Sequence, residues 1–202
     1  MSSTTLLLAD IPALTRLQDS KTSEWHDCNI IWKNKTWQDL VLSNHGYNYE
    51  LWHQEDQARR DDLGFEHVYQ AKRKIDYYNQ QRNNFMEKMD LYWQQELQVS
   101  TNNTAPLHTE TPGMIIDRLS ILSLKIYHMA IQTRRQDCDK THKETCEHKL
   151  AVLKIQRNDL MEALLQLHDE IKEGKKTFKL YKQMKMYNDP NLNPQLYTHS
   201  HE

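Results

Sequence analysis

The chain has 202 residues and a formal net charge of −2, with four glycines and five prolines. This length suits one domain with a sizeable core. The scarcity of glycine and proline, together with apolar residues at helical spacing, predicts an all-helical protein. The near-neutral charge argues against broad electrostatic binding of nucleic acid or of an anionic membrane surface.

Cysteine usage and the first residues bear on the compartment. Cys28, Cys138 and Cys146 are too few and too scattered for a disulfide framework, which favours a reducing environment. The start lacks the basic region and the long apolar stretch of a signal peptide. No run approaches the roughly 18 apolar residues that a membrane span requires. We therefore expect a cytoplasmic protein without a membrane span, and the sequence carries no signal of oligomeric state.

Helix-start signals predict where the helices of the first part of the chain begin. Asp10 can cap an N-terminal helix over residues 10–32, and Thr36 with Asp39 has the form of a capping box that opens a second helix. A longer helix follows, in which apolar residues recur three and four positions apart. Together these signals predict a helical hairpin over residues 36–98.

The stretch after Thr111 predicts a buried helix. Thr111 and Pro112 suit a helix start, and the residues that follow are apolar on nearly every face. A polar connector up to Cys146 separates this helix from a last long one, which gives a second hairpin over residues 112–173. The buried helix also carries charged or titratable side chains that must be paired or neutralised: Asp117, Arg118, Lys125 and His128.

The two long helices repeat one pattern. A shift of 75 residues, the separation of Arg82 from Arg157, superposes two Gln-Arg-Asn runs. Each run interrupts the seam of its helix, which is the stripe of apolar residues along one helix face. We interpret this as the duplication of a helical hairpin. The predicted fold is one all-α domain over residues 1–197: an antiparallel bundle of four long helices, an N-terminal helix, and a basic C-terminal segment with a short helix at residues 175–197. Residues 198–202 are expected to be a disordered tail.

Four stretches carry a likeness to a known family: residues 48–56, 74–83, 110–129 and 182–188. They resemble an uncharacterised bacterial family, domain of unknown function 4254, whose members are helical and soluble. The resemblance supplies no reaction, ligand or catalytic residue. Members often neighbour cell-envelope glycosyltransferase genes, so the resemblance implies a glycosyltransferase-pathway protein as a candidate partner.

Arg82 and Arg157 occupy seam positions. A guanidinium at such a buried position needs a carboxylate or an anionic ligand as its partner. Glu55 and Asp117 are the carboxylates expected to meet them. One interpretation is a closed network of buried ion pairs that fixes helix register. The other, which we favour as the function, is a pocket for an anionic or phosphorylated metabolite. Its predicted ligand-binding residues are Arg82, Arg157, Lys125, Asn48 and Arg118, and its candidate acid–base residues are His53, Glu55, Asp117 and His128.

Carboxylates at helical spacing raise the alternative of a divalent metal. Glu50 and His53 stand three residues apart, as in di-iron helical bundles. A duplicated motif would need a second glutamate 75 residues after Glu50, but that position is Lys125. That departure disfavours a symmetric dimetal site. A mononuclear site, with iron as one candidate ion, remains an alternative with Glu50, His53 and Asp56 as its ligands.

A second pair, Glu87 and Asp90, repeats the spacing that holds Mg²⁺ in all-α nucleotide pyrophosphohydrolases. Three functions therefore stay open. The favoured one is metabolite binding. The others are an accessory protein of envelope glycan assembly, docking through the C-terminal segment, and a Mg²⁺-dependent pyrophosphohydrolase. Whether the chain is an enzyme is left open.

Overall fold

The computed structural model describes residues 7–99, 104–186 and 189–197. No β-strand occurs within these ranges, so the all-α prediction is confirmed. The predicted tail, residues 198–202, lies outside them. The helical elements in chain order are α1 (Ile11–Glu24), α2 (Trp37–Gln57), the short 3-10 helix η1 (Asp61–Leu63), α3 (Phe65–Glu96), α4 (Pro112–Thr133), α5 (Lys140–Lys172) and α6 (Pro194–Tyr197).

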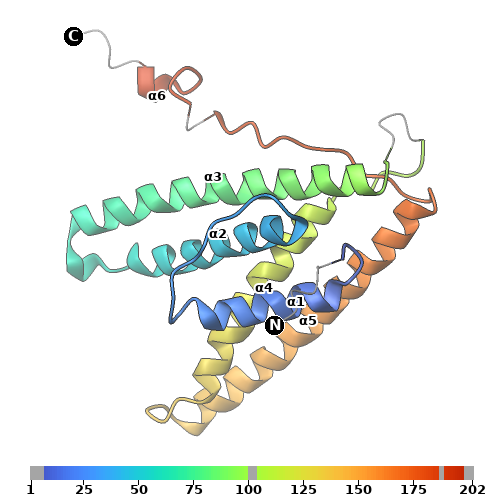
Figure 1. Ribbon diagram of the computed structural model, residues 1–202. Helices are drawn as coiled ribbons and strands as arrows, with labels where there is room; N and C mark the ends of the chain where they lie inside the picture. The colour runs from blue at the N-terminus through green and yellow to red at the C-terminus, as the bar shows by residue number, and fades with distance from the viewer. Residues whose placement is uncertain (1–6, 100–103, 187–188, 198–202) are drawn as a thin grey trace.

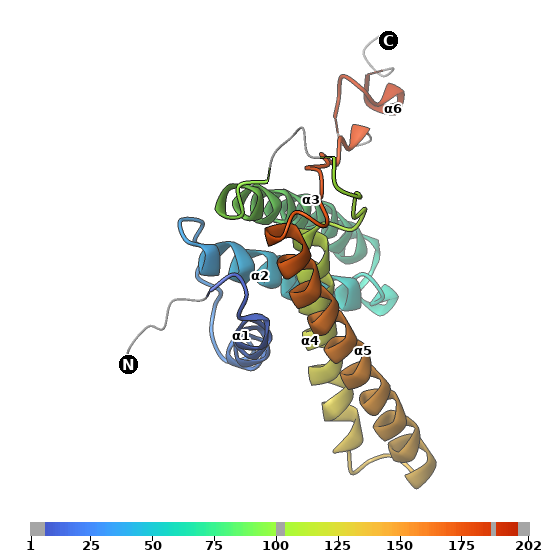
Figure 2. The same cartoon turned by 90° about the vertical axis from the view of Figure 1, so that its right-hand side faces the viewer.

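Two helical hairpins, α2–α3 and α4–α5, form the body of the molecule (Figure 1). Helix α4 lies at its centre and packs against α1, α2, α3 and α5. The second hairpin runs at an angle across the first instead of lying alongside it (Figure 2). The helix order thus follows the prediction, with the four long helices arranged as crossed hairpins. The internal duplication stays a prediction.

Capping side chains account for the starts of α1, α2 and α4. Asp10 accepts a hydrogen bond from the first turn of α1, and Thr36 and Asp39 form a reciprocal capping box at the start of α2. Thr111 caps α4, with Pro112 at the first helical position. These starts are where the sequence placed them, because a cap depends only on neighbouring residues.

Helix α1 is shorter than predicted, since it ends at Glu24 and not near residue 32. Just past its end, Nδ1 of His26 lies 2.7 Å from the carbonyl oxygen of Thr22. That oxygen would accept the backbone N–H of residue 26 in a continuing helix. The histidine side chain therefore occupies the acceptor that another turn of helix would need.

Helix α5 begins earlier than predicted. The connector was expected to run to Cys146, but the helix starts at Lys140. Asp139 precedes it and accepts a hydrogen bond from the backbone N–H of His142 at 2.7 Å. An aspartate N-cap satisfies one of the free donors of the first turn, and this is sufficient to start the helix in a polar segment.

The core lies where α4 meets its neighbours. Ile116 and Leu119 of α4 are fully buried, as are Met89 and Trp93 of α3 and Leu164 of α5. Burying a large apolar side chain contributes about 1.5–3 kcal/mol. The crossing of the two hairpins is therefore the most strongly stabilised part of the fold.

The C-terminal segment returns along α3. Thr177 pairs with Leu107 as an isolated bridge, and Phe178 is buried in the core. Beyond Phe178 the chain runs extended beside α3 (Figure 1), where the backbone N–H of Gln183 donates to Glu87 at 2.9 Å. The segment is thus fastened at its start and exposed further on.

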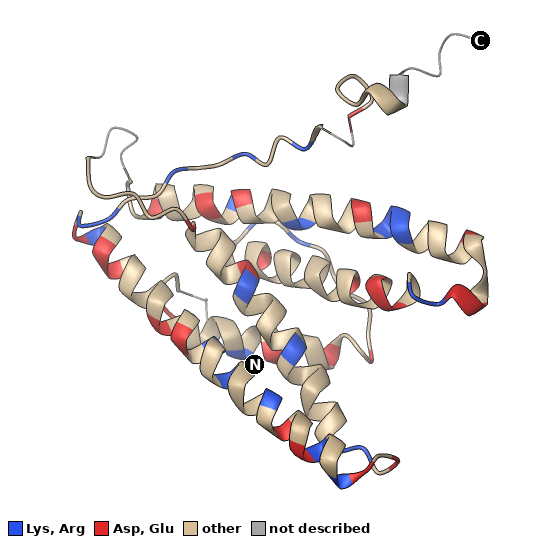
Figure 3. Ribbon diagram, turned by 180° about the vertical axis from the view of Figure 1, so that it is seen from behind, with Lys and Arg blue, Asp and Glu red and all other residues tan. Residues whose placement is uncertain are grey.

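Charged residues of both signs are mixed along the chain, in line with the net charge of −2. Lys and Arg are interspersed with Asp and Glu along the helices (Figure 3). Within the described ranges, no helix combines the length and the apolar character needed to cross a lipid bilayer.

Candidate functional site

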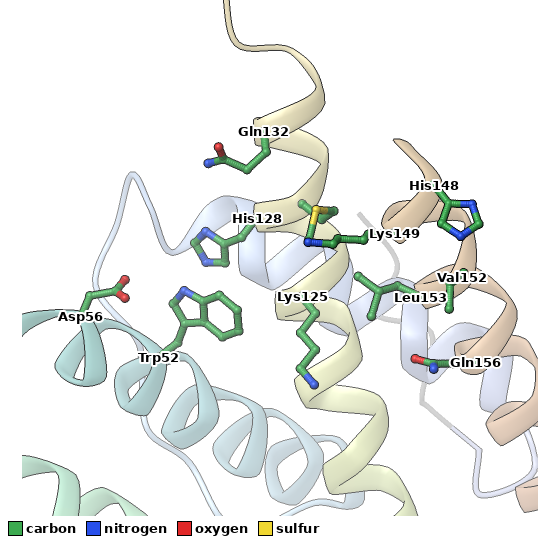
Figure 4. Close-up of a pocket in the computed structure, with 11 residues that line it drawn as sticks. Trp52, Asp56, Lys125, His128, Gln132, His148, Lys149, Val152, Leu153 and Gln156 are labelled. Carbon is green, nitrogen blue, oxygen red and sulfur yellow. The ribbon is translucent and has the colours of Figure 1, made fainter. Parts of the chain in front are cut away.

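A hollow of about 780 Å³ opens between α2, α4 and α5; we refer to it as the α2/α4/α5 pocket (Figure 4). A second hollow of about 570 Å³ shares Lys125 and Gln156 with it and continues between α4 and α5. The two hollows are therefore neighbours along the second hairpin. The walls of the pocket carry Trp52 and Asp56 from α2, Lys125 and His128 from α4, and Lys149 and Leu153 from α5, among others.

The pocket carries cationic side chains without partners. Lys125 and Lys149 both line it, and among the described residues neither forms an ion pair or a hydrogen bond. His148 lies beside them, and Asp56 is the acidic residue of the lining (Figure 4). Two unpaired ammonium groups facing a partly apolar hollow create a field that favours an anion.

One wall of the pocket is a stacked aromatic pair. The indole of Trp52 lies face to face with the imidazole of His128, with ring centroids 4.6 Å apart and an interplanar angle of 3°. The stack fixes the orientation of His128 at the edge of the pocket. Trp52 could not be singled out from the sequence, because the ring on which it stacks belongs to another helix.

His128 belongs to a cluster of three histidines, with His26 and His53. One ring nitrogen from each lies within 4.8 Å of the other two. The three residues come from the turn after α1, from α2 and from α4. His53 and His128 were predicted as site residues, and the structure brings them together. His26 was not predicted, because residue 26 was assigned to a continuing helix.

Burial keeps two of these histidines neutral. It lowers the pKa of His128 to about 4, with the neighbouring His53 and His26 adding to the effect. Burial also lowers the pKa of His53, again assisted by His26, while Asp56 acts in the opposite direction. Both rings are therefore unprotonated at neutral pH, and each has a lone pair available to a proton or another ligand.

Asp117 is the centre of a buried hydrogen-bond network. Arg82 donates to both of its oxygens, from Nε to Oδ1 at 2.8 Å and from Nη2 to Oδ2 at 2.5 Å. The side-chain amides of Asn44 and Asn48 donate to Oδ1 at 3.0 Å and 2.9 Å. The expected pairing of Arg82 with Asp117 is confirmed. With both oxygens engaged, Asp117 is not positioned as a free general base.

The second seam arginine has a different partner. Nη1 of Arg157 lies 2.7 Å from a carboxylate oxygen of Asp19, on α1. Arg82 and Arg157 therefore share no partner, and each is already neutralised by an aspartate. The structure does not bring the two arginines into one anion site.

Other predicted residues lie at the surface. Arg118 pairs with Glu110 at 2.7 Å, and Glu55 pairs with Arg59 at 2.9 Å in a pair that is about half exposed. Exposed pairs of this kind contribute about 0–1 kcal/mol. Of the predicted ligand-binding residues, Lys125 is the one that lines the α2/α4/α5 pocket.

Glu50 is separated from the histidine cluster. Burial raises the pKa of its carboxyl group, while Lys74 and a hydrogen bond with Tyr78, both on α3, act in the opposite direction. Glu50 therefore interacts with α3, whereas His53 of the same helix faces His128 of α4. The Glu50–His53 spacing does not form one site here.

Glu87 and Asp90 are also engaged within the protein. Asp90 is buried and accepts hydrogen bonds from the hydroxyl of Thr111 and the backbone N–H of Gly113, both at 2.6 Å. Glu87 accepts from the backbone of Gln183. The pair fastens α3 to the start of α4 and to the C-terminal segment.

A family model described as Protein of unknown function (DUF4254) matches residues 38–180. The chain belongs to this family. The match covers α2, α3, α4 and α5, so two histidines of the cluster lie inside the DUF4254 region and His26 lies before it. A search of curated proteins and a search of solved structures found no match.

We expect this DUF4254 protein to lose stability in acid through His45. The ring is fully buried, with Nε2 2.9 Å from the hydroxyl of Thr22 and Nδ1 2.8 Å from that of Ser120. Burial lowers its pKa to about 3. Below pH 6.5 His45 therefore becomes protonated in the unfolded chain but stays neutral in the folded chain. The free energy of unfolding should fall by about 1.4 kcal/mol per pH unit from this group.

Urea unfolding at pH 7.0 and 5.0 tests this, with an expected loss of about 2 kcal/mol from His45 alone. The variant His45→Gln should show a flatter pH dependence than the wild type. Asp90→Asn should show a steeper one, because burial raises the pKa of Asp90 to about 6 and so favours folding as pH falls. Equal slopes in all three proteins would contradict the assignment.

Proposed function

We propose that this protein binds an anionic small metabolite in the α2/α4/α5 pocket. The observation that carries the proposal is the pair Lys125 and Lys149, two ammonium groups that line the pocket and have no partner among the described residues. A phosphate or carboxylate group between them would be held by charge-assisted hydrogen bonds. The proposal keeps the anionic ligand expected from the sequence and moves its site away from the two paired arginines.

The rest of the pocket supports a ligand with a flat or apolar portion. Met129, Val152 and Leu153 give part of the lining an apolar character, and Trp52 supplies an aromatic wall. The side-chain amides of Gln132 and Gln156 also line it and can donate and accept hydrogen bonds. A few polar groups on an otherwise apolar concave surface are typical of small-molecule sites. Any acid–base chemistry on a ligand here would fall to His128 or Asp56, which line the pocket.

The test is ligand binding by the wild type and by lysine variants. We expect a thermal-shift screen of nucleotides, nucleotide sugars and sugar phosphates to find a ligand; at 100 times its dissociation constant it would stabilise by about 2.7 kcal/mol. Lys125→Ala and Lys149→Ala should each weaken binding about 10–100-fold, the equivalent of one charged hydrogen bond. Isothermal titration calorimetry gives the affinities.

Lys154→Ala is the matched control, because Lys154 is an exposed lysine on the same helix and outside the pocket lining. Its affinity should equal that of the wild type. If the three alanine variants bind the ligand equally well, the anion is held elsewhere and the proposal fails.

A second candidate, an accessory protein that docks another protein, is favoured by the C-terminal segment. Met184 is 81% exposed and Met186 is 58% exposed on a stretch that is fastened mainly at its start. Truncation after Lys179 separates the two functions, since it leaves the buried Phe178 and the pocket in place. A docking protein would lose its partner, and a metabolite-binding protein would keep its ligand. The geometry of Glu87 and Asp90 gives the pyrophosphohydrolase no comparable support.

A further inference from the structure

The histidine cluster next to the pocket has a geometry of its own. Its members come from three separate parts of the chain: His26 follows α1, His53 is on α2 and His128 is on α4. One ring nitrogen of each lies within 4.8 Å of the others. We propose that His26, His53 and His128 bind a single transition-metal ion, with zinc the ion whose ligand preference this set matches.

Hydrogen bonding favours metal ligation over mutual packing of the rings. Nε2 of His53 and Nε2 of His128 are both buried, and neither has a hydrogen-bond partner in the part of the chain that the structure describes. Leaving a buried polar atom unsatisfied costs about 1–3 kcal/mol, so such atoms usually mark a missing partner. A metal ion is a partner that both nitrogens can share.

The third histidine is oriented as a ligand by the backbone. A carbonyl oxygen can only accept, so the contact of His26 Nδ1 with the oxygen of Thr22 at 2.7 Å requires the proton to be on Nδ1. The lone pair of His26 is then on Nε2. Metal-binding histidines commonly donate their other N–H to a carbonyl in this way, which fixes both the tautomer and the orientation of the ring.

The rings are held in place by aromatic neighbours. Trp52 stacks on His128 at 4.6 Å, Tyr127 stacks on His26 at 4.6 Å, and Tyr49 contacts His53 at 4.5 Å between ring centroids. A tetrahedral zinc with nitrogens at about 2.1 Å needs them about 3.4 Å apart. The observed limit of 4.8 Å therefore requires an inward movement of no more than about 1.4 Å.

Three protein ligands leave a fourth position of a tetrahedral ion open, which is the arrangement of catalytic and not of structural zinc sites. Asp56 stands one turn after His53 and lines the pocket together with His128. Its carboxylate lies outside the group of three nitrogens and can accept a proton from a water bound to the ion. The ion would thus lie at the edge of the α2/α4/α5 pocket. This site replaces the predicted grouping of Glu50, His53 and Asp56, because Glu50 interacts with α3 instead.

The experiment uses the full chain, purified and stripped with a chelator, and titrated with Zn²⁺ and with Co²⁺ as an optical probe. We expect binding of one ion per chain, with visible absorption of Co²⁺ in a four-coordinate site, and no binding of Mg²⁺, which prefers oxygen ligands. His128→Gln and His26→Gln should each weaken Zn²⁺ binding by at least about 100-fold, more than the loss of a hydrogen-bonded neighbour of a ligand.

His148→Gln is the control, since His148 lines the same pocket but lies outside the cluster. Its affinity for Zn²⁺ should be that of the wild type. His26 is an exposed residue, so His26→Gln reports on binding even if His128→Gln folds poorly. Wild-type protein that binds no Zn²⁺, or that binds it no more tightly than His26→Gln, overturns the proposal and leaves the cluster as ring packing. Lys125→Ala should keep Zn²⁺ binding, so failure of the metabolite site and failure of the metal site can be told apart.

Discussion

Replacing Asp117 by leucine is expected to lower the free energy of unfolding by about 3–5 kcal/mol. The carboxylate is 3% exposed and receives hydrogen bonds from Arg82, Asn44 and Asn48. Its loss leaves the positive charge of Arg82 in a site where only 26% of that side chain reaches solvent. A guanidinium cannot lose its proton to escape the cost, so the destabilisation should be large.

Urea unfolding of the single and double variants tests this expectation. Asp117→Asn keeps the shape of the side chain and some acceptor capacity, so it should lose less stability than Asp117→Leu. The double variant Arg82→Met with Asp117→Leu removes both charges and should be more stable than Asp117→Leu alone. A single Asp117→Leu variant within about 1 kcal/mol of the wild type would show that the pair is not structurally important.

The helices could be predicted from the sequence because their signals are local. The capping box of Thr36 with Asp39 and the start at Thr111 involve only residues a few positions apart. The end of α1 could not be predicted, because it depends on the ring of His26 competing for a carbonyl oxygen. The crossing angle of the two hairpins could not be predicted either. Apolar periodicity shows which face of a helix is buried but not the angle at which two helices pack.

Parts of the candidate site could be predicted where a buried charge demanded a partner. Arg82 at a seam position required a carboxylate, and Asp117 on the apolar helix was the natural one. The partner of Arg157 was missed, because Asp19 lies on α1 and nothing in its spacing shows that α1 packs against α5. The sequence spacing of polar residues on separate helices does not show which of them meet in the folded protein.

The same limit explains why the histidine cluster was only partly predicted. His53 was chosen for its three-residue spacing from Glu50, and His128 for its place on the apolar helix after Thr111. His26 contributes through a turn after α1, and its role depends on where that turn places the ring. Lys149 was missed for a related reason, since a lysine on a charged helix looks like an ordinary solvated residue until a pocket is seen beside it.

Replacing Gly113 by alanine should destabilise the protein by up to about 3 kcal/mol, although alanine is intrinsically favoured over glycine in helices by about 1 kcal/mol. A Cβ at this position would lie 2.5 Å from the backbone oxygen of Met86 and 2.8 Å from Oδ1 of Asp90. The first contact is with the main chain of α3, which cannot move without disturbing that helix. Displacing α4 instead would break the hydrogen bonds that Thr111 and Gly113 donate to the buried Asp90.

Gly46→Ala provides the matched comparison, because Gly46 is also helical and its added Cβ would meet side chains only, the ring of Trp32 at 3.0 Å and Ile30 at 3.3 Å. Side chains can shift by a few tenths of an ångström, so the gain in helix propensity should offset most of the crowding. Thermal unfolding should therefore place Gly46→Ala near the wild type and Gly113→Ala roughly 5–10 °C below it. If Gly113→Ala unfolds at or above the wild-type temperature, α4 does not approach α3 as closely as described, and Asp90 does not anchor its first turn.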